Sequence, residues 1–221
     1  MLTLHRAASV LPDPADPTAP FFTDGAVVVR DERVEAVGPY RELAAAHPGA
    51  RVRDWGPAVL TPGLRNPYGH WLLERAYHPD PREEIGAEPV ADGLVGSTDE
   101  ARCGASARRG LQRMLGFGVT AVAGPFERAS VRTAVARSGL VGLPGAAGLS
   151  GPLDPLAVLT LAEAVHGRVA VGGRADFAVF PVPVLPAPDG SVGVAGEGRV
   201  EPAAGGCLAT VLGGRLVYRR R

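Results

Sequence analysis

The sequence predicts a mixed α/β protein in which β structure at both ends of the chain encloses an α/β region. Three observations support this fold class. Short β-branched runs separated by turn residues fill roughly the first sixty positions. Apolar residues at helical and strand spacing alternate between residues 97 and 165. Near the end, two apolar runs flank Gly213-Gly214, which is typical of a tight hairpin.

The N-terminal segment is predicted to consist mostly of strands. Asp31-Glu32 separates two β-branched runs, so these runs are expected to pair as a hairpin. Prolines between Pro12 and Pro17 predict a loop, because each removes a backbone donor and restricts its neighbour. The expected elements are strands over 2–11, 25–30, 33–38, 52–55 and 59–61 and a helix over 40–47.

The middle segment changes to alternating helices and strands. Residues 75–96 carry prolines and glycines without periodicity and are predicted to be loop. Ser97 is the expected N-cap of the next helix, with Glu100 reaching back in a capping box. The elements expected to follow are helices over 101–115, 126–137 and 154–165 and strands over 119–123 and 140–143.

The C-terminal segment returns to strands. A strand is expected over 175–184, although Pro181 and Pro183 restrict its far half to a sheet edge. Residues 186–198 are predicted to be loop, and the runs over 207–212 and 215–218 are predicted to form the final hairpin.

The composition suits a compact protein without a polyanionic partner. The chain has 221 residues, 46% of them hydrophobic, and a net charge of +0, so nucleic acid and anionic membranes are not expected as partners. Cys103 and Cys207 lack metal-binding or redox spacing, which favours inert thiols in a reducing cytosol. No leader and no apolar run of about 18 residues is evident, so the cytoplasm is the expected location.

Four segments carry motifs of one known family. They read GAVVVRDERVEAVGP over 25–39, LTPGLRNPYGH over 60–70, RVAVGGRADFAVF over 168–180 and VLGGRLVY over 211–218. In this order they resemble the amidohydrolase superfamily, particularly imidazolonepropionase and aminodeoxyfutalosine deaminase. The resemblance implies a composite β-sandwich built from both termini, here 1–61 and 168–221, which in the family flanks a (β/α)8 barrel.

The resemblance also implies a metal site that this sequence lacks in its usual form. The family's first barrel strand carries two histidines two residues apart, which point to the same face of the strand. Here the first position is Tyr68 and the second is His70. Of the later histidines, His78 lies in the proline-rich loop and His166 at the end of the last expected helix, so neither is expected beside His70.

The segment between the two halves of the β region is too short for a complete barrel. A (β/α)8 barrel takes roughly 200 residues at minimum, whereas residues 62–167 provide only about half of that. We therefore expect a reduced α/β region with strands over 64–68, 119–123 and 140–143. Because so few strands cannot close, an open sheet edge is expected, covered by a loop, a helix, a second copy in a homodimer or a protein partner.

The candidate site residues follow from these motifs. His70 is expected to be a structural or exposed histidine, and the alternative is that His70 and Tyr68 form a remnant site for a small ligand or a metal. No cofactor is expected, with zinc or iron as the alternative. Glu74 and Asp99 are expected to be surface or helix-capping groups, with an acid role as the alternative. The residues to which the resemblance gives a structural role are Pro62, Gly63, Asn66, Ala175 and Asp176.

Three functional hypotheses remain open from the sequence. The first is a non-catalytic relative that has a degenerate metal site and binds a ligand or partner. The second is a hydrolase of non-peptide carbon–nitrogen bonds, with a residual or intersubunit metal that activates water. The third is a structural or assembly module. Metal content, self-association and ligand-induced stabilisation would separate them.

Overall fold

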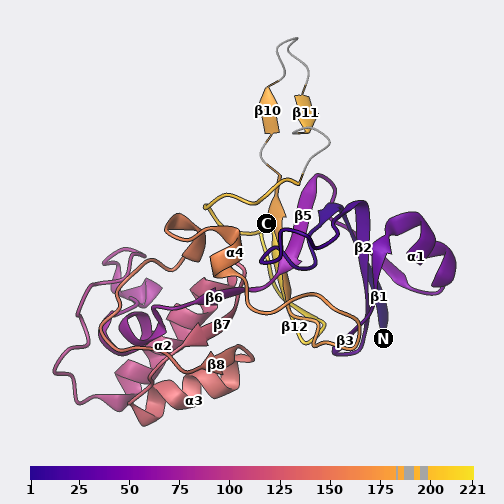
Figure 1. Cartoon of the computed structure of the whole chain (residues 1–221). Helices are drawn as coiled ribbons and strands as arrows, with labels where there is room; N and C mark the ends of the chain where they lie inside the picture. Colours follow the sequence, from indigo (N-terminus) through magenta and orange to yellow (C-terminus); the bar gives the residue numbers. More distant parts are fainter. Residues whose placement is uncertain (183, 187–191, 195–198) are drawn as a thin grey trace.

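The computed structural model describes residues 1–182, 184–186, 192–194 and 199–221 (Figure 1). Its strands are β1 (Leu2–Val10), β2 (Phe22–Arg30), β3 (Arg33–Pro39), β4 (Arg51–Asp54), β5 (Ala58–Pro62), β6 (Leu64–Asn66), β7 (Val119–Ala123), β8 (Val141–Leu143), β9 (Phe177–Pro181), β10 (Val184–Pro186), β11 (Val192–Val194), β12 (Ala209–Leu212) and β13 (Arg215–Arg219). Its α-helices are α1 (Tyr40–Ala46), α2 (Glu100–Leu115), α3 (Ala129–Ser138) and α4 (Leu161–Ala164).

Strands from both ends of the chain share one eight-stranded sheet, which we call the β region. The strand order is β13-β12-β9-β5-β1-β2-β3, and β4 pairs with the first half of β1. The second half of β1 pairs with β5, at Ser9 and Val10. The antiparallel pairing of β5 with β9 then joins the N-terminal strands to the C-terminal ones.

The sheet of the β region curves around its own core. One apolar cluster combines Val29 and Val34 of β2 and β3 with Phe177 of β9 and Val211 of β12. β3 and β12 lie near opposite ends of the strand order, so they can share a core only if the sheet folds over on itself. On the outer face of β1 and β2, helix α1 covers a smaller cluster around Leu4.

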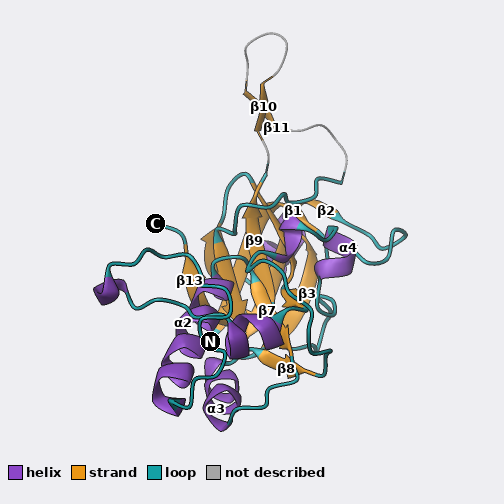
Figure 2. Ribbon diagram, turned by 90° about the vertical axis from the view of Figure 1, so that its left-hand side faces the viewer, coloured by secondary structure: helices purple, strands orange, loops and turns teal. Residues whose placement is uncertain are grey.

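A smaller parallel sheet forms a second part, which we call the α/β region. Its strand order is β6-β7-β8, and helices α2 and α3 connect its strands as crossovers (Figures 1 and 2). All five residues of β7 are buried, as expected of the central strand of a parallel sheet. Helix α2 buries one face, including Ala107, Leu111 and Met114, and exposes the other.

Strand β9 joins the two regions, because it is buried on both faces. Phe177 and Val179 face the core of the β region, whereas Ala178 and Phe180 belong to the cluster that contains Met114 and most of the α/β core. This alternation follows from the two-residue period of a strand. Strand β9 therefore has the core of the β region on one face and, on the other, an apolar cluster that residues of both regions build.

Most of the predicted elements are confirmed, with several corrections. The strand predicted over 64–68 ends at Asn66, and the helix predicted from residue 126 begins at Ala129. The helix predicted over 154–165 is a 3-10 turn over Pro155–Ala157 followed by the short α4. It is interrupted because Asp154 and Thr160 each cap a separate turn, the second in a capping box with Glu163.

The capping prediction for α2 was wrong in its residue. The N-cap is Asp99, whose carboxylate accepts from the backbone N–H of Arg102, and Ser97 instead accepts from the N–H of Asp99. Part of the loop predicted over 186–198 lies outside the described residues, as does Pro183. Within that segment, β11 pairs with β10, so the loop prediction was wrong at 192–194. None of the described helices is long and apolar enough to cross a membrane.

Candidate functional site

The carboxyl ends of β6, β7 and β8 meet at one edge of the α/β region. Because the three strands are parallel, the loops that follow them gather there. In barrel and open α/β proteins this edge is where ligands bind. The loop after β6 carries Tyr68 and His70, and a pocket of about 620 Å³ opens beside it. The pocket is lined by His70, Glu74, Arg75, Val95, Gly96, Glu100, Glu127, Arg128, Ala129 and Arg132.

Asn66 shapes the loop that carries the two predicted site residues. Its buried side chain donates to the carbonyls of Pro152 and Leu153 at 3.0 and 3.1 Å, and its oxygen accepts from the N–H of Tyr68 at 2.8 Å. The ring of Tyr68 lies against Gly151, where a Cβ atom would be only 2.4 Å from the ring. Tyr68 therefore packs against the chain and the apolar core, and it does not line the pocket.

His70 is the imidazole that faces this pocket. Its Nδ1 lies 2.9 Å from the carbonyl oxygen of Pro125, and a carbonyl can only accept, so the ring proton is assigned to Nδ1. The Nε2 atom of the neutral ring then carries the lone pair. A histidine fixed in this way presents Nε2 to a proton donor or a cation.

Glu74 is buried, so it is not a surface group, and its contacts fit the other alternative that the sequence gave, a helix-capping group. Only 6% of it is exposed, in the π-helical turn over Trp71–Arg75. Its Oε1 accepts from the backbone N–H groups of Glu127 and Arg128 at 2.7 and 3.0 Å, directly before α3 begins. The carboxylate therefore stabilises the N-terminal end of α3 from a distant part of the chain, in the way that a capping side chain does.

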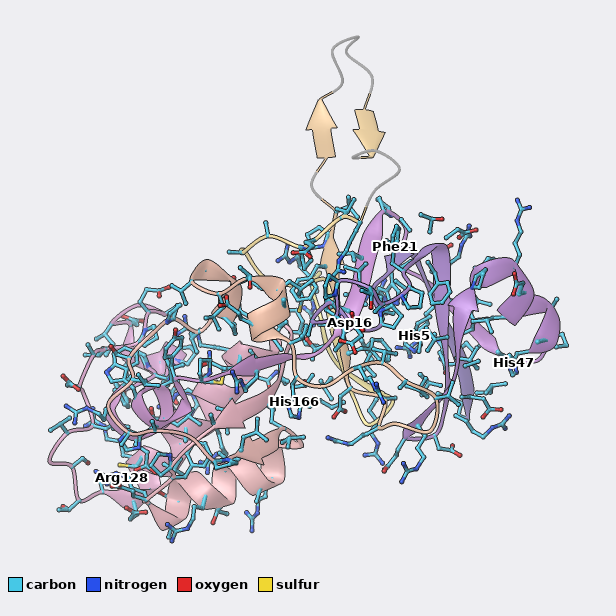
Figure 3. All side chains as sticks on the ribbon, in the orientation of Figure 1. His5, Asp16, Phe21, His47, Arg128 and His166 are labelled. Carbon is cyan, nitrogen blue, oxygen red and sulfur yellow. The ribbon has the colours of Figure 1, made fainter. Side chains whose placement is uncertain are left out.

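Arg128, labelled in Figure 3, completes this network through its guanidinium group. Its Nε lies 3.7 Å from Oε2 of Glu74, and its Nη1 donates to the carbonyl of Ser97 at 2.9 Å and lies 3.4 Å from Glu100. The paired charges of Glu74 and Arg128 are thus used to hold loops together. The exposed carboxylate of Glu127 has no ionic partner among the described residues and remains open to a ligand, as does Nε2 of His70.

The other histidines do not reach this pocket. His78 is fully buried, and its Nε2 donates to the carbonyl of Leu72 at 2.8 Å. Burial lowers the pKa of His78 to about 4, and the nearby charges of Arg113 and Arg109 add to this shift. His166 lies between the two regions (Figure 3), where its backbone N–H donates to the backbone carbonyl of Gly63. Across the described ranges, no three His, Cys, Asp or Glu side chains gather in a way that could hold a metal ion.

The motif residues of the β region lie around the junction between the two sheets. Asp176 accepts from the N–H of Gly213 at 2.7 Å and from Arg174 at 2.7 Å, and burial raises the pKa of this carboxyl. Ala175 donates to Glu32 through its backbone, and Pro62 pairs with Phe177 in the sheet. A Cβ at Gly63 would lie 2.1 Å from the side chain of Thr120, so only glycine fits there.

The contacts of Glu74 with residues 127 and 128 were not predicted from the sequence. The contacting residues are more than 50 positions apart, and no local residue spacing predicts such contacts. The sequence pattern related to these contacts is a carboxylate after strand β6 and an arginine directly before helix α3. That pattern is too common to carry a prediction.

Comparison with known proteins confirms the resemblance drawn from the motifs. Residues 25–50 match a family model described as the imidazolonepropionase-like composite domain of bacteria. A 5-methylthioadenosine/S-adenosylhomocysteine deaminase of Nitratidesulfovibrio vulgaris is 29% identical over 202 residues, which cover 81% of this chain and 42% of the relative. An imidazolonepropionase of Pyrobaculum arsenaticum is 39% identical over 72 residues, which cover 29% of this chain and 18% of the relative.

Two solved structures also match this chain over part of its length. A guanine deaminase from Bradyrhizobium japonicum has a TM-score of 0.49 at 19% identity, covering 70% of this chain and 36% of its own. An aminofutalosine deaminase from Helicobacter pylori has a TM-score of 0.45 at 20% identity, covering 71% of this chain and 37% of its own. This chain thus spans less than half of the length of the curated relatives that it matches.

Proposed function

We propose that this chain is an amidohydrolase-like protein that binds a small ligand at the β6–β8 edge without the hydrolytic metal of its relatives. The observation that carries the proposal is the pair at the family's metal position. Tyr68 is packed against Gly151, and His70 is the lone imidazole of the pocket. A hydrolytic zinc needs about three protein ligands, and the described residues at this edge do not provide them.

We further propose that the two regions correspond to a composite β domain and a shortened barrel. The shared sheet of N-terminal and C-terminal strands supports the first part, together with the family match inside β2, β3 and α1. The parallel order β6-β7-β8, with a helix in each crossover, supports the second part, because this is how a (β/α) barrel begins.

A partner or a second copy at the edge of β8 is part of this proposal. Strand β8 ends the order of the parallel sheet, and its central residue Gly142 is exposed. At the other end, β6 forms a bridge between Leu64 and Val165, so that edge is partly covered. Light scattering on the purified chain tests this directly. A monomer at all concentrations, unchanged by Gly142→Pro, would argue against self-association through β8.

The alternative is a working hydrolase or deaminase whose metal site is completed by a second chain. The specific observation in its favour is the tautomer of His70, which leaves Nε2 free in a pocket at the carboxyl ends of parallel strands. The names of the relatives indicate purine-ring deamination or cyclic amide hydrolysis as the reactions to test.

One set of measurements separates the two functions. Purified protein would be analysed for bound zinc and iron, and assayed for ammonia release from 5-methylthioadenosine and S-adenosylhomocysteine. We expect neither stoichiometric metal nor turnover, but a ligand-induced rise in melting temperature that His70→Ala removes. His47→Ala, which changes a histidine on the far side of the molecule, is the control (Figure 3). Metal and turnover that both disappear in His70→Ala would establish the hydrolase instead.

A further inference from the structure

A second pocket lies in the β region, between the edge strands β4 and β13. Its volume is about 200 Å³, and it is lined by Arg51, Arg53, Asp54, Trp55, Leu216 and Arg219. It shares no lining residue with the pocket of His70. Figure 3 shows His5, which stacks on Trp55, among the strands of the β region, and Arg128 at the opposite end of the molecule.

The arginines of this pocket carry uncompensated positive charge. Arg51 and Arg53 are two residues apart on β4 and so project to the same side, where Arg219 of β13 meets them. In the described part of the chain, no carboxylate lies within ion-pair distance of any of the three. Burial and the neighbouring charges of Arg51 and Arg219 lower the pKa of Arg53, which indicates mutual repulsion.

The acid beside these arginines is already engaged elsewhere. Oδ2 of Asp54 lies 3.0 Å from Nη1 of Arg6, and its Oδ1 accepts from the N–H of Gly56 at 2.8 Å. Arg6 in turn also binds Asp24 at 2.7 Å. Arg6 shares its single positive charge between Asp54 and Asp24, so it balances Asp54 only in part. The lining still holds three arginines against the one carboxylate of Asp54, so the pocket keeps a net positive charge.

The aromatic ring of Trp55 lines the same pocket. The indole Nε1 of Trp55 is shielded from solvent and has no acceptor among the described residues. The ring is held between His5, whose centroid is 6.0 Å away in a stacked arrangement, and Arg219, whose guanidinium carbon is 6.0 Å from the ring centroid. Trp55 therefore forms an aromatic wall of the pocket beside the guanidinium group of Arg219.

We infer that this pocket binds a small oxyanion of the phosphate or phosphoryl class. Guanidinium groups bind such anions through pairs of parallel, charge-assisted hydrogen bonds, and three of them line this pocket. The pocket is smaller than the roughly 300 Å³ at which sites for drug-sized ligands begin, so it suits a single tetrahedral anion or the phosphoryl end of a larger molecule.

The test uses the two tryptophans of the chain as an internal comparison. Inorganic phosphate is titrated into ¹⁵N-labelled protein at low ionic strength, and the two indole N–H signals are followed by NMR. We expect the Trp55 signal to shift saturably, while the signal of Trp71, in the α/β region, stays in place and reports that the fold is intact. Added sodium chloride should weaken the binding, because exposed charges are screened.

Matched variants then assign the binding to this pocket. Arg53→Gln and Arg219→Gln should each weaken phosphate binding roughly tenfold, because each removes a charge-assisted hydrogen bond. Arg215→Gln, at the other end of β13, should leave it unchanged. His70→Ala should also leave it unchanged, so this inference and the proposed function can fail separately.

Several outcomes would overturn the inference. These are equal shifts of both tryptophans, no saturation in the millimolar range, or the same affinity in Arg53→Gln as in Arg215→Gln. A Trp55 shift produced by a heparin or RNA oligomer but not by phosphate would also overturn it, in favour of a polyanion surface. Sulfate binding as tightly as phosphate would support a general oxyanion site, whereas a preference for phosphate would support the phosphoryl class.

Discussion

The β region and the α/β region bury their apolar side chains with different arrangements of strands. In the β region, β1 pairs with three other strands, and the curved sheet encloses its own core. In the α/β region, the short strands depend on α2, α3 and the outer face of β9 for cover. The parallel sheet therefore brings loops and polar side chains together at one edge, whereas the β region holds its charged pocket between two edge strands.

The largest effect is expected where the two regions meet. Phe180→Ala should lower the free energy of unfolding by about 3–5 kcal/mol, because it opens a cavity in the shared core. Phe21→Ala, at a 38% exposed phenylalanine, should cost less than about 0.5 kcal/mol and serves as the control. Urea denaturation followed at both tryptophans measures each value. A single transition in wild type that becomes two in Phe180→Ala would show that β9 couples the regions.

A smaller loss is expected from the buried carboxylate of the α/β region. Glu74→Gln should cost about 2 kcal/mol, because a buried group that accepts from two backbone N–H groups loses its charge beside Arg128. Glu88→Gln is the matched control, since Glu88 is 92% exposed and lies 3.7 Å from Arg113. If both variants unfold at the same denaturant concentration, Glu74 does not stabilise the start of α3.

Each region also contains one buried histidine, which predicts a shared dependence on pH. Burial lowers the pKa of His5 to about 3 and of His78 to about 4 from an ordinary value of 6.5. The folded state therefore binds fewer protons than the unfolded state. The stabilisation is complete above pH 6.5 and is lost as the pH falls toward 4, by at most about 1.4 kcal/mol per pH unit for each histidine.

Thermal unfolding between pH 7 and pH 5 measures this slope. His5→Gln and His78→Gln should each reduce it by about half, and the double variant should remove most of it. Equal slopes in wild type and the double variant would mean that other groups control acid unfolding.

The smallest effect distinguishes the two candidate caps of α2. Asp99→Ala should cost about 1 kcal/mol, because the side chain accepts from the N–H of Arg102 at 2.9 Å. Ser97→Ala should cost less, since its hydroxyl accepts two long contacts, from the N–H of Asp99 at 3.3 Å and from the thiol of Cys103 at 3.9 Å. Denaturant midpoints of the two variants decide between them, and a larger loss in Ser97→Ala would reverse the assignment.

Elements of the β region were predicted from the sequence more accurately than the segment over 154–165. The hairpin β2–β3, helix α1 and the β12–β13 hairpin were predicted within a few residues, because turn residues and apolar spacing mark them locally. The segment over 154–165 was harder, since its apolar spacing suits a helix while Asp154 and Thr160 each start a new turn. In that segment side-chain capping outweighed periodicity.

In the candidate site, too, one feature was visible in the sequence and another was not. The replacement of the first family histidine by Tyr68 was visible in the sequence and led directly to the proposal of a degenerate metal site. The sequence indicated a surface or helix-capping group at Glu74, but its burial was not visible, because its partners follow β7 and are distant in the sequence.

The amino-acid sequence by itself determined the order of most strands and helices and the family motifs, since these depend on neighbouring residues. Only the tertiary structure decided which distant groups meet. It paired β5 with β9 and so joined strands from both ends of the chain, placed Glu74 at the start of α3 and brought Arg219 to the ring of Trp55. These contacts depend on how sheets curve and pack, and contacts between residues so far apart in the chain leave no local pattern to read.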